Sequence, residues 1–142
     1  MKPLHVLSII AVLGCLSFAA PSEAKAAGRH YYSSWGYHPQ KSYHYTYYYY
    51  KPRVSYSGYQ HHYCIYYPSR PRYVYYYNPH RRVYWGRYDL EAKGYSLLED
   101  ADRKPNLSDI PESAFPKPGG MPNIPESEDG VAMPPPPAVP KG

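Results

Sequence analysis

The apolar and polar positions of this chain follow a short, regular pattern only between residues 61 and 98. Written in steps of nine, three successive stretches align: YCIYYPSRP, RYVYYYNPH and RRVYWGRYD. Each stretch places one aliphatic residue, Ile65, Val74 or Val83, before a pair of aromatic residues, and the first two stretches end in Pro, Asn and Ser. Short β-favouring runs between turn signals predict a small all-β antiparallel meander over about 61–98.

The end of this pattern leaves two interpretations open. A fourth run, 95–98, can pair with 84–88 across DLEAKG, where Gly94 suits a turn residue with positive φ. Alternatively, the apolar residues of 90–103 share one face of a short helix. Gly94 disfavours that helix, but a helix confined to 97–103 stays compatible with the sequence.

The segment 27–60 has no apolar period and consists mainly of Tyr, His, Ser, Gly and Pro. Its one aliphatic residue after the small residues at its start is Val54. Because little aliphatic surface is available to offset the entropy of ordering the chain, we expect this segment to be disordered, with transient extended structure.

The tail, 99–142, is acidic and rich in proline, which blocks helix and sheet and favours polyproline II. The sequence Ile-Pro-Glu-Ser occurs twice in it, at Ile110 and at Ile124. We expect a disordered spacer; the alternative is a docking strip anchored by its Ile, Phe and Met side chains. The expected fold is therefore a mostly disordered, low-complexity chain around the small meander.

The N-terminal residues 1–26 have the layout of a secretory signal peptide, with an early Lys, a short apolar run and small residues. Cleavage is expected after Ala26, with Ala24 as the second choice. An alternative is a lipoprotein signal in which Cys15 is lipidated, and membrane attachment is expected only in that case. The predicted localisation is secreted: periplasm, cell envelope or extracellular space.

Export leaves one cysteine, Cys64, in the mature chain. In an oxidising compartment a lone cysteine indicates either an intermolecular disulfide, here a disulfide-linked homodimer, or a free thiol. Cys64 with His61 and His62 is also a weak candidate for binding a metal. Structural zinc sites show two paired ligand clusters, and the sequence has one loose cluster, so no resident metal or cofactor is expected.

Charge divides the mature chain. Residues 28–88 contain nine Lys and Arg and no Asp or Glu, whereas 89–142 contain ten acidic and five basic residues. This asymmetry suggests that the acidic tail lies on the basic half through contacts that salt would abolish. No nucleophile, base and acid occur in a catalytic pattern, so the chain is predicted not to be an enzyme.

Basic residues among aromatic ones are typical of surfaces that bind single-stranded nucleic acid, but the predicted export argues against nucleic acid as a partner. The same residue types suit polysaccharides and self-association. We expect a secreted, non-enzymatic, Tyr-rich structural or interaction protein of the cell envelope or matrix, with possible cross-links through tyrosine or Cys64. The alternative is a small polysaccharide-binding module whose basic aromatic face comprises Arg72, Tyr75, Arg82, Tyr84, Trp85 and Arg87.

Two resemblances accompany these expectations. YHYTYYYYKP and MPPPPAVP are similar in composition to plant extensins, although the chain lacks their alternating repeat. Residues 81–130, beginning RRVYWGRYDLEAKGYSLLEDADRK, resemble short exported bacterial proteins of unassigned function. The second resemblance implies secretion and a shared unit around 84–98, and it brings no activity and no site residues.

Overall fold

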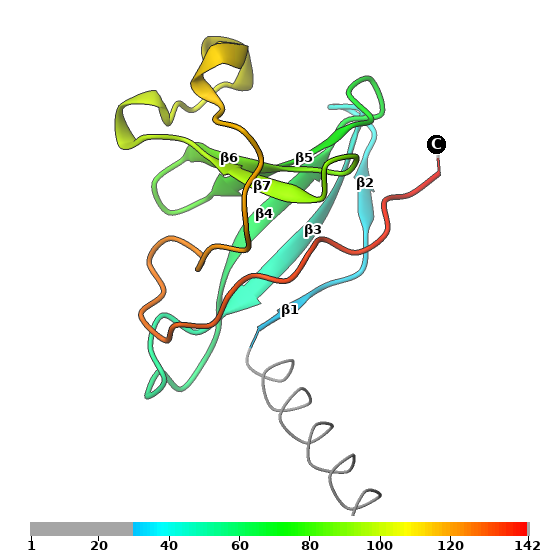
Figure 1. Ribbon diagram of the computed structural model, residues 1–142. Helices are drawn as coiled ribbons and strands as arrows, with labels where there is room; N and C mark the ends of the chain where they lie inside the picture. The colour runs from blue at the N-terminus through cyan, green and yellow to red at the C-terminus, as the bar shows by residue number, and fades with distance from the viewer. Residues whose placement is uncertain (1–29, 142) are drawn as a thin grey trace, which may run out of the picture.

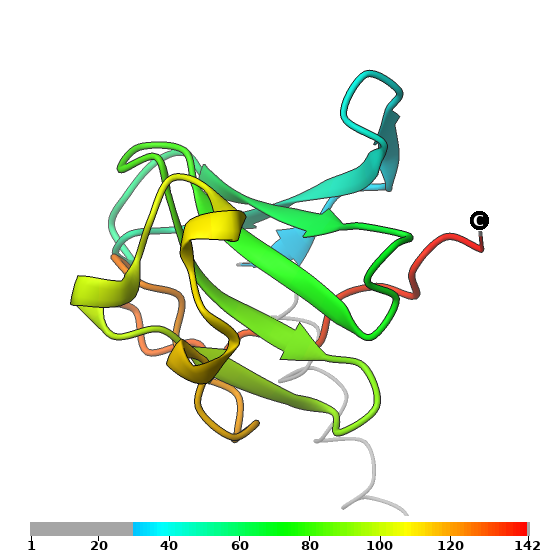
Figure 2. The same cartoon turned by 90° about the horizontal axis from the view of Figure 1, so that it is seen from above.

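Residues 30–141 are described by a computed structural model, and the predicted signal peptide with Cys15 lies outside this range. Within it, one seven-stranded antiparallel sheet curls into half a barrel (Figures 1 and 2). The strands are β1 (Tyr31–Tyr32), β2 (Gly36–His38), β3 (Tyr43–Tyr50), β4 (Gln60–Tyr66), β5 (Tyr73–Asn78), β6 (Val83–Asp89) and β7 (Gly94–Leu97). Three single 3₁₀ turns follow: η1 (Asp100–Asp102), η2 (Leu107–Asp109) and η3 (Glu112–Ala114).

The strands β3 to β7 lie in chain order, each antiparallel to the next, as a meander does. The predicted all-β meander is therefore present, as β4 to β7, and it extends backwards through β3. The expected pairing of the fourth run is also present, with Tyr88 opposite Tyr95 and Gly86 opposite Leu97. On the outer edge of β3, β1 and β2 pair with its two halves.

The prediction that 27–60 is disordered is wrong for the described part of that segment. β3 alternates along its length, and Thr46, Tyr48 and Tyr50 are buried on one face of the sheet. The prediction failed because it counted aliphatic residues, whereas each aromatic ring buries about 150–250 Å² and can replace them. Tyrosine supplies most of this core.

The prediction of a disordered tail over 99–142 is also wrong for the described residues. Ile124 and Met133 are 1% and 0% exposed in the core, and the tail runs back across the sheet from the η turns to the C-terminus (Figure 1). Ile110 is buried in a different cluster, so the two copies of Ile-Pro-Glu-Ser anchor the tail on opposite faces of the sheet. The tail thus packs against the chain's own sheet through a few isolated apolar side chains.

The sheet accordingly has two covered faces. The tail face is the one covered by residues 121–139. In its core, Ile124 and Met133 of the tail pack with Tyr48, Tyr76 and Trp85 of the sheet. The groove face is the opposite one, where Ile65, Tyr75 and Tyr84 pack with Leu98 and Ile110. Residues 98–115 cover only part of the groove face (Figure 2), and the rest stays open.

Two hairpin loops have the same construction. The side-chain oxygens of Asn78 and Asp89 each accept hydrogen bonds from two backbone amides of the following loop. Each loop ends in a residue with positive φ, Arg82 at 59° and Lys93 at 58°. The expectation that Gly94 supplies the positive φ is therefore wrong; Gly94 is needed because a Cβ there would lie 2.6 Å from the Gly119 carbonyl oxygen.

Candidate functional site: a tyrosine groove with a basic rim

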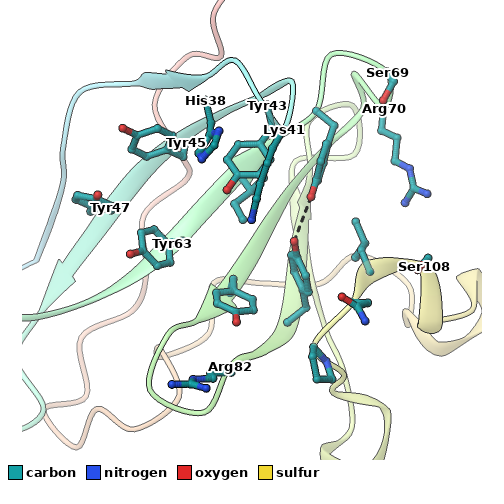
Figure 3. A pocket seen from close by; sticks show the side chains of 17 residues that line it. His38, Lys41, Tyr43, Tyr45, Tyr47, Tyr63, Ser69, Arg70, Arg82 and Ser108 are labelled. Carbon is teal, nitrogen blue, oxygen red and sulfur yellow. Dashed lines mark hydrogen bonds between the residues drawn. The ribbon is translucent and has the colours of Figure 1, made fainter.

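An open groove of about 950 Å³ occupies the uncovered part of the groove face. Rings from β3 and β4 stand in a row along its floor, and the basic side chains lie at its margins (Figure 3). Seven tyrosines line it, namely Tyr43, Tyr45, Tyr47, Tyr63, Tyr67, Tyr77 and Tyr84. We call this surface the tyrosine groove.

The floor of the tyrosine groove follows from strand alternation. Residues two apart project to the same face of a sheet, so the odd-numbered tyrosines of β3 share the groove face. The register then continues the row across the sheet, because Tyr47 is opposite Tyr63 and Tyr63 is opposite Tyr77. The ring centroids along this row are 5.1 Å and 6.2 Å apart.

The rim of the groove is basic. Lys41 comes from the β2–β3 loop, Arg70 from the β4–β5 loop and Arg82 from the β5–β6 loop. No carboxylate belongs to the lining, and within residues 30–141 neither Lys41 nor Arg82 pairs with one. Arg70 donates to the Tyr75 hydroxyl at 3.4 Å and leaves the rest of its guanidinium at the rim.

Three of the groove phenols have a raised pKa and hold their protons more firmly than an ordinary tyrosine. Burial raises the pKa of Tyr43, Tyr47 and Tyr84 above the ordinary value of a tyrosine. The pKa shift of Tyr84 comes first from burial and then from its neighbour Tyr67, whose hydroxyl lies 3.1 Å from that of Tyr84. These three rings therefore stay uncharged and do not offset the positive charge of the rim.

Of the six residues predicted to form a basic aromatic face, the structure brings only Arg82 and Tyr84 into the groove. Tyr75 is on the same face but is 1% exposed beneath the covering segment. Trp85 lies in the core of the tail face and is also 1% exposed. Consecutive strand residues project to opposite faces, so Tyr84 and Trp85 cannot share one surface.

The two remaining members of the predicted face, Arg72 and Arg87, are engaged elsewhere. Arg72 donates to both carboxylate oxygens of Asp89, at 2.9–3.1 Å. The Arg87 guanidinium lies between the rings of Tyr73 and Phe115, 3.7 Å and 4.0 Å from their centroids, and donates to Glu112. Both arginines join parts of the chain together and are not available to a ligand as free cations.

The weak metal candidates do not converge. His61 projects to the groove face, whereas His62 and Cys64 project to the tail face. The His62 ring is fully buried and accepts a hydrogen bond from Trp85 Nε1 at 3.0 Å. Burial lowers the pKa of His62 to about 3, even though Glu126 Oε2 lies 3.8 Å away. Among residues 30–141, no group of three possible metal ligands comes together.

Cys64, the candidate for an intermolecular disulfide, is 0% exposed between β3 and β5. Burial raises the pKa of its thiol, which disfavours the reactive thiolate. A disulfide with another chain would require the sheet to open. The homodimer through Cys64 therefore stays a prediction that the folded state does not favour.

A buried Tyr-His-Asp chain joins the start of the described sequence to the tail. His30 contacts the Tyr48 hydroxyl through Nδ1 and Asp129 Oδ2 through Nε2, both at 2.7 Å. Burial alone would raise the pKa of Asp129, but hydrogen bonds from His30, the Val131 N–H and Ser127 outweigh it and lower that pKa. Since His30 is 3% exposed and Tyr48 is 0% exposed, no substrate can reach these hydrogen-bonded side chains. Their role is to hold the tail against the sheet.

Most of the groove was not predicted from the sequence. Lys41, Tyr43, Tyr45 and Tyr47 lie in the segment expected to be disordered, and Tyr63 lies in the predicted meander, where no role was assigned to it. One signal could have revealed the floor: YHYTY places tyrosine at every second position, which is the period of a strand face. The rim depends on which loops meet in space, and the sequence carries no signal for that.

Comparison of the chain with protein-family models, curated proteins and solved structures finds no match. Within residues 30–141, no helix has the length and apolar character needed to cross a bilayer. The geometry of the tyrosine groove therefore carries the functional argument.

Proposed function

We propose that this protein is a secreted, non-enzymatic binding domain that holds an acidic polysaccharide in the tyrosine groove. The observation that carries the proposal is the combination of seven tyrosine rings with Lys41, Arg70 and Arg82 in an open groove whose lining contains no carboxylate. Sugar rings stack on aromatic faces, and their hydroxyls can exchange hydrogen bonds with phenols. Uronate or sulfate groups would meet the rim cations.

The shape of the groove favours a chain as ligand. Basic residues stand at both ends, because Lys41 and Arg70 lie in loops at one end of the strands and Arg82 lies in a loop at the other. The tyrosine row connects them across β3, β4 and β5. A polymer that repeats an acidic sugar can contact both ends at once, which a single small anion cannot do.

The structural role expected from composition, a matrix protein cross-linked through accessible tyrosines, receives less support. Of the 21 tyrosines, all of which the structure describes, only Tyr31, Tyr37 and Tyr59 are exposed. Most of the tyrosine side chains pack within the fold, in the two cores or along the floor of the groove. We therefore propose a binding domain rather than a matrix of disordered, cross-linked chains.

The test is a titration of the purified protein with a polyuronate, a neutral glucan and a single-stranded oligonucleotide, at low and high salt. We expect the polyuronate to bind, with an affinity that falls as salt rises. Tighter binding of the neutral glucan would refute the role of the rim, and tighter binding of the oligonucleotide would refute the ligand class. Binding of none of the three would overturn the proposal.

A matched pair of variants locates the site. Arg82→Ala removes a rim cation, whereas Arg53→Ala removes an exposed arginine that does not line the groove. Both variants lose one positive charge, so a loss of affinity confined to Arg82→Ala identifies the groove. Equal losses in both variants would instead indicate attraction by net charge alone and would contradict a site in the groove.

A further inference from the structure

The β1 edge of the sheet carries a cluster of accessible tyrosines that the proposed binding function does not use. Tyr31 in β1 is 43% exposed and Tyr59, in the β3–β4 loop, is 40% exposed. Tyr31 pairs with Tyr49 across the β1–β3 register. None of these three residues lines the tyrosine groove.

The rings of Tyr31 and Tyr49 are stacked. Their centroids are 4.9 Å apart and their planes differ by 23°, and among the ring contacts of residues 30–141 this is the one near-parallel pair. Tyr31 also meets Tyr59, but edge-on, at 5.4 Å and 75°. Two near-parallel rings at this separation place carbons of one ring in van der Waals contact with carbons of the other.

We propose that Tyr31 and Tyr49 form an oxidative modification site at which a one-electron oxidant creates a dityrosine link within the chain. Each phenol loses one electron and its hydroxyl proton, and the two phenoxyl radicals join through one ring carbon ortho to each oxygen. The two hydrogens on the joined carbons then return to the phenol oxygens. In total two electrons and two protons leave the protein, and one peroxide molecule accepts them to give two waters.

Register makes this coupling intramolecular. Tyr31 and Tyr49 are held opposite each other by strand pairing, so a radical on one ring has its partner already in contact. Neither hydroxyl makes a hydrogen bond with another described residue, so losing its proton breaks no structural bond. The link would fasten β1, a strand of two residues, covalently to β3.

Tyr37 supplies the matched control. It is more exposed than Tyr31, at 51%, and is also on a short edge strand. Its ring contact is with His44, 4.7 Å away, and not with a second tyrosine in a stacked arrangement. If exposure alone decided the reaction, Tyr37 would be consumed first and would link separate molecules.

The experiment treats the purified full chain with a haem peroxidase and limiting peroxide, then follows dityrosine fluorescence, gel mobility and tryptic peptides. Trypsin cuts after Arg29, Lys41 and Arg53, so the link joins peptide 30–41 to peptide 42–53. We expect this pair, lighter by two hydrogen atoms than the sum of its parts, in protein that still migrates as a monomer. Fluorescence should be lost in Tyr31→Phe and Tyr49→Phe and kept in Tyr37→Phe.

Three outcomes would overturn the proposal. A ladder of covalent oligomers without the 30–41 to 42–53 link would show intermolecular coupling by exposure. A link from Tyr31 to Tyr59 would show that the proposal names the wrong pair of tyrosines. Absence of dityrosine would show that this edge is not a modification site. The phenylalanine variants keep the rings and remove no observed hydrogen bond, so their folding can be confirmed by near-UV circular dichroism. No glycan is present in this test, so its result is independent of the proposed groove function.

Discussion

Truncation of Met133 tests the idea that the proline-rich tail is part of the core. Met133 and Met121 both precede a proline in the tail, but Met133 is 0% exposed and Met121 is 41% exposed. Changing Met133 to alanine removes three buried side-chain atoms and leaves its backbone hydrogen bond to Pro122, at 2.8 Å, in place. The same change at Met121 removes atoms that are largely in water.

The expected loss is large for Met133 and small for Met121. At about 0.8 kcal/mol for each buried methylene-sized group, the lost transfer free energy is about 2.5 kcal/mol. The cavity left in the core raises the loss in the free energy of unfolding to about 3 kcal/mol, within the range for such truncations. For a folded unit of about 110 residues this corresponds to a fall in Tm of about 12 °C.

The assay is thermal and urea unfolding followed by near-UV circular dichroism, which reports on the packed tyrosines. Met121→Ala is the control and should stay within about 0.5 kcal/mol of the parent protein. If Met133→Ala keeps the midpoint of the parent protein, as Met121→Ala is expected to do, the tail contributes no core and the reasoning is refuted. If both lower the midpoint equally, general tail composition rather than burial governs stability.

Three further predictions concern pH, the β7 edge and salt. Since burial lowers the pKa of His62 to about 3 and an unfolded histidine titrates near 6.5, the unfolded state binds the extra proton between these values. The free energy of unfolding should fall as pH drops below about 6.5, by up to about 1.4 kcal/mol per pH unit. Urea titrations at several pH values measure this fall, which should be smaller per pH unit in His62→Gln. Gly94→Ala should destabilise the protein by about 1–3 kcal/mol through its clash with the Gly119 carbonyl, whereas Gly120→Ala, which has open space, should not; equal thermal midpoints would contradict this. In 1 M NaCl the tail should stay resistant to protease, because Ile124 and Met133 rather than surface ion pairs hold it; rapid cleavage in 121–139 at high salt alone would refute this.

Sequence reasoning succeeded where turn chemistry and strand propensity agreed. The nine-residue pattern located β4, β5 and β6, because Asn, Pro and Ser mark the loops and tyrosine favours extended backbone. The pairing of β7 with β6 followed from the same logic. Where the alternative prediction placed a helix, over 90–103, the structure has a single 3₁₀ turn, η1.

Sequence reasoning failed where tyrosine replaces aliphatic residues. A scale that counts tyrosine as half polar finds no core in β3, yet Tyr48 and Tyr50 are both 0% exposed. The prediction of a disordered tail was wrong for a related reason. Proline excludes regular secondary structure but does not prevent burial. An isolated apolar side chain such as Ile124 needs only a complementary surface to pack against. The two members of the predicted face that do line the groove, Arg82 and Tyr84, could not reveal its other lining residues without the register of β3 against β4.

The contacts between the ends of the described chain have a consequence for the order in which the protein can fold. Tyr32 donates a hydrogen bond to the Pro134 carbonyl and Trp35 donates one to the Ala138 carbonyl, across 102 and 103 residues of sequence. A chain emerging from its N-terminus can pair β3 with β4 early, but one face of that sheet stays uncovered until the last residues arrive. Such long-range closure slows folding. The tail face of the sheet would therefore be covered late in folding, after the strands have paired.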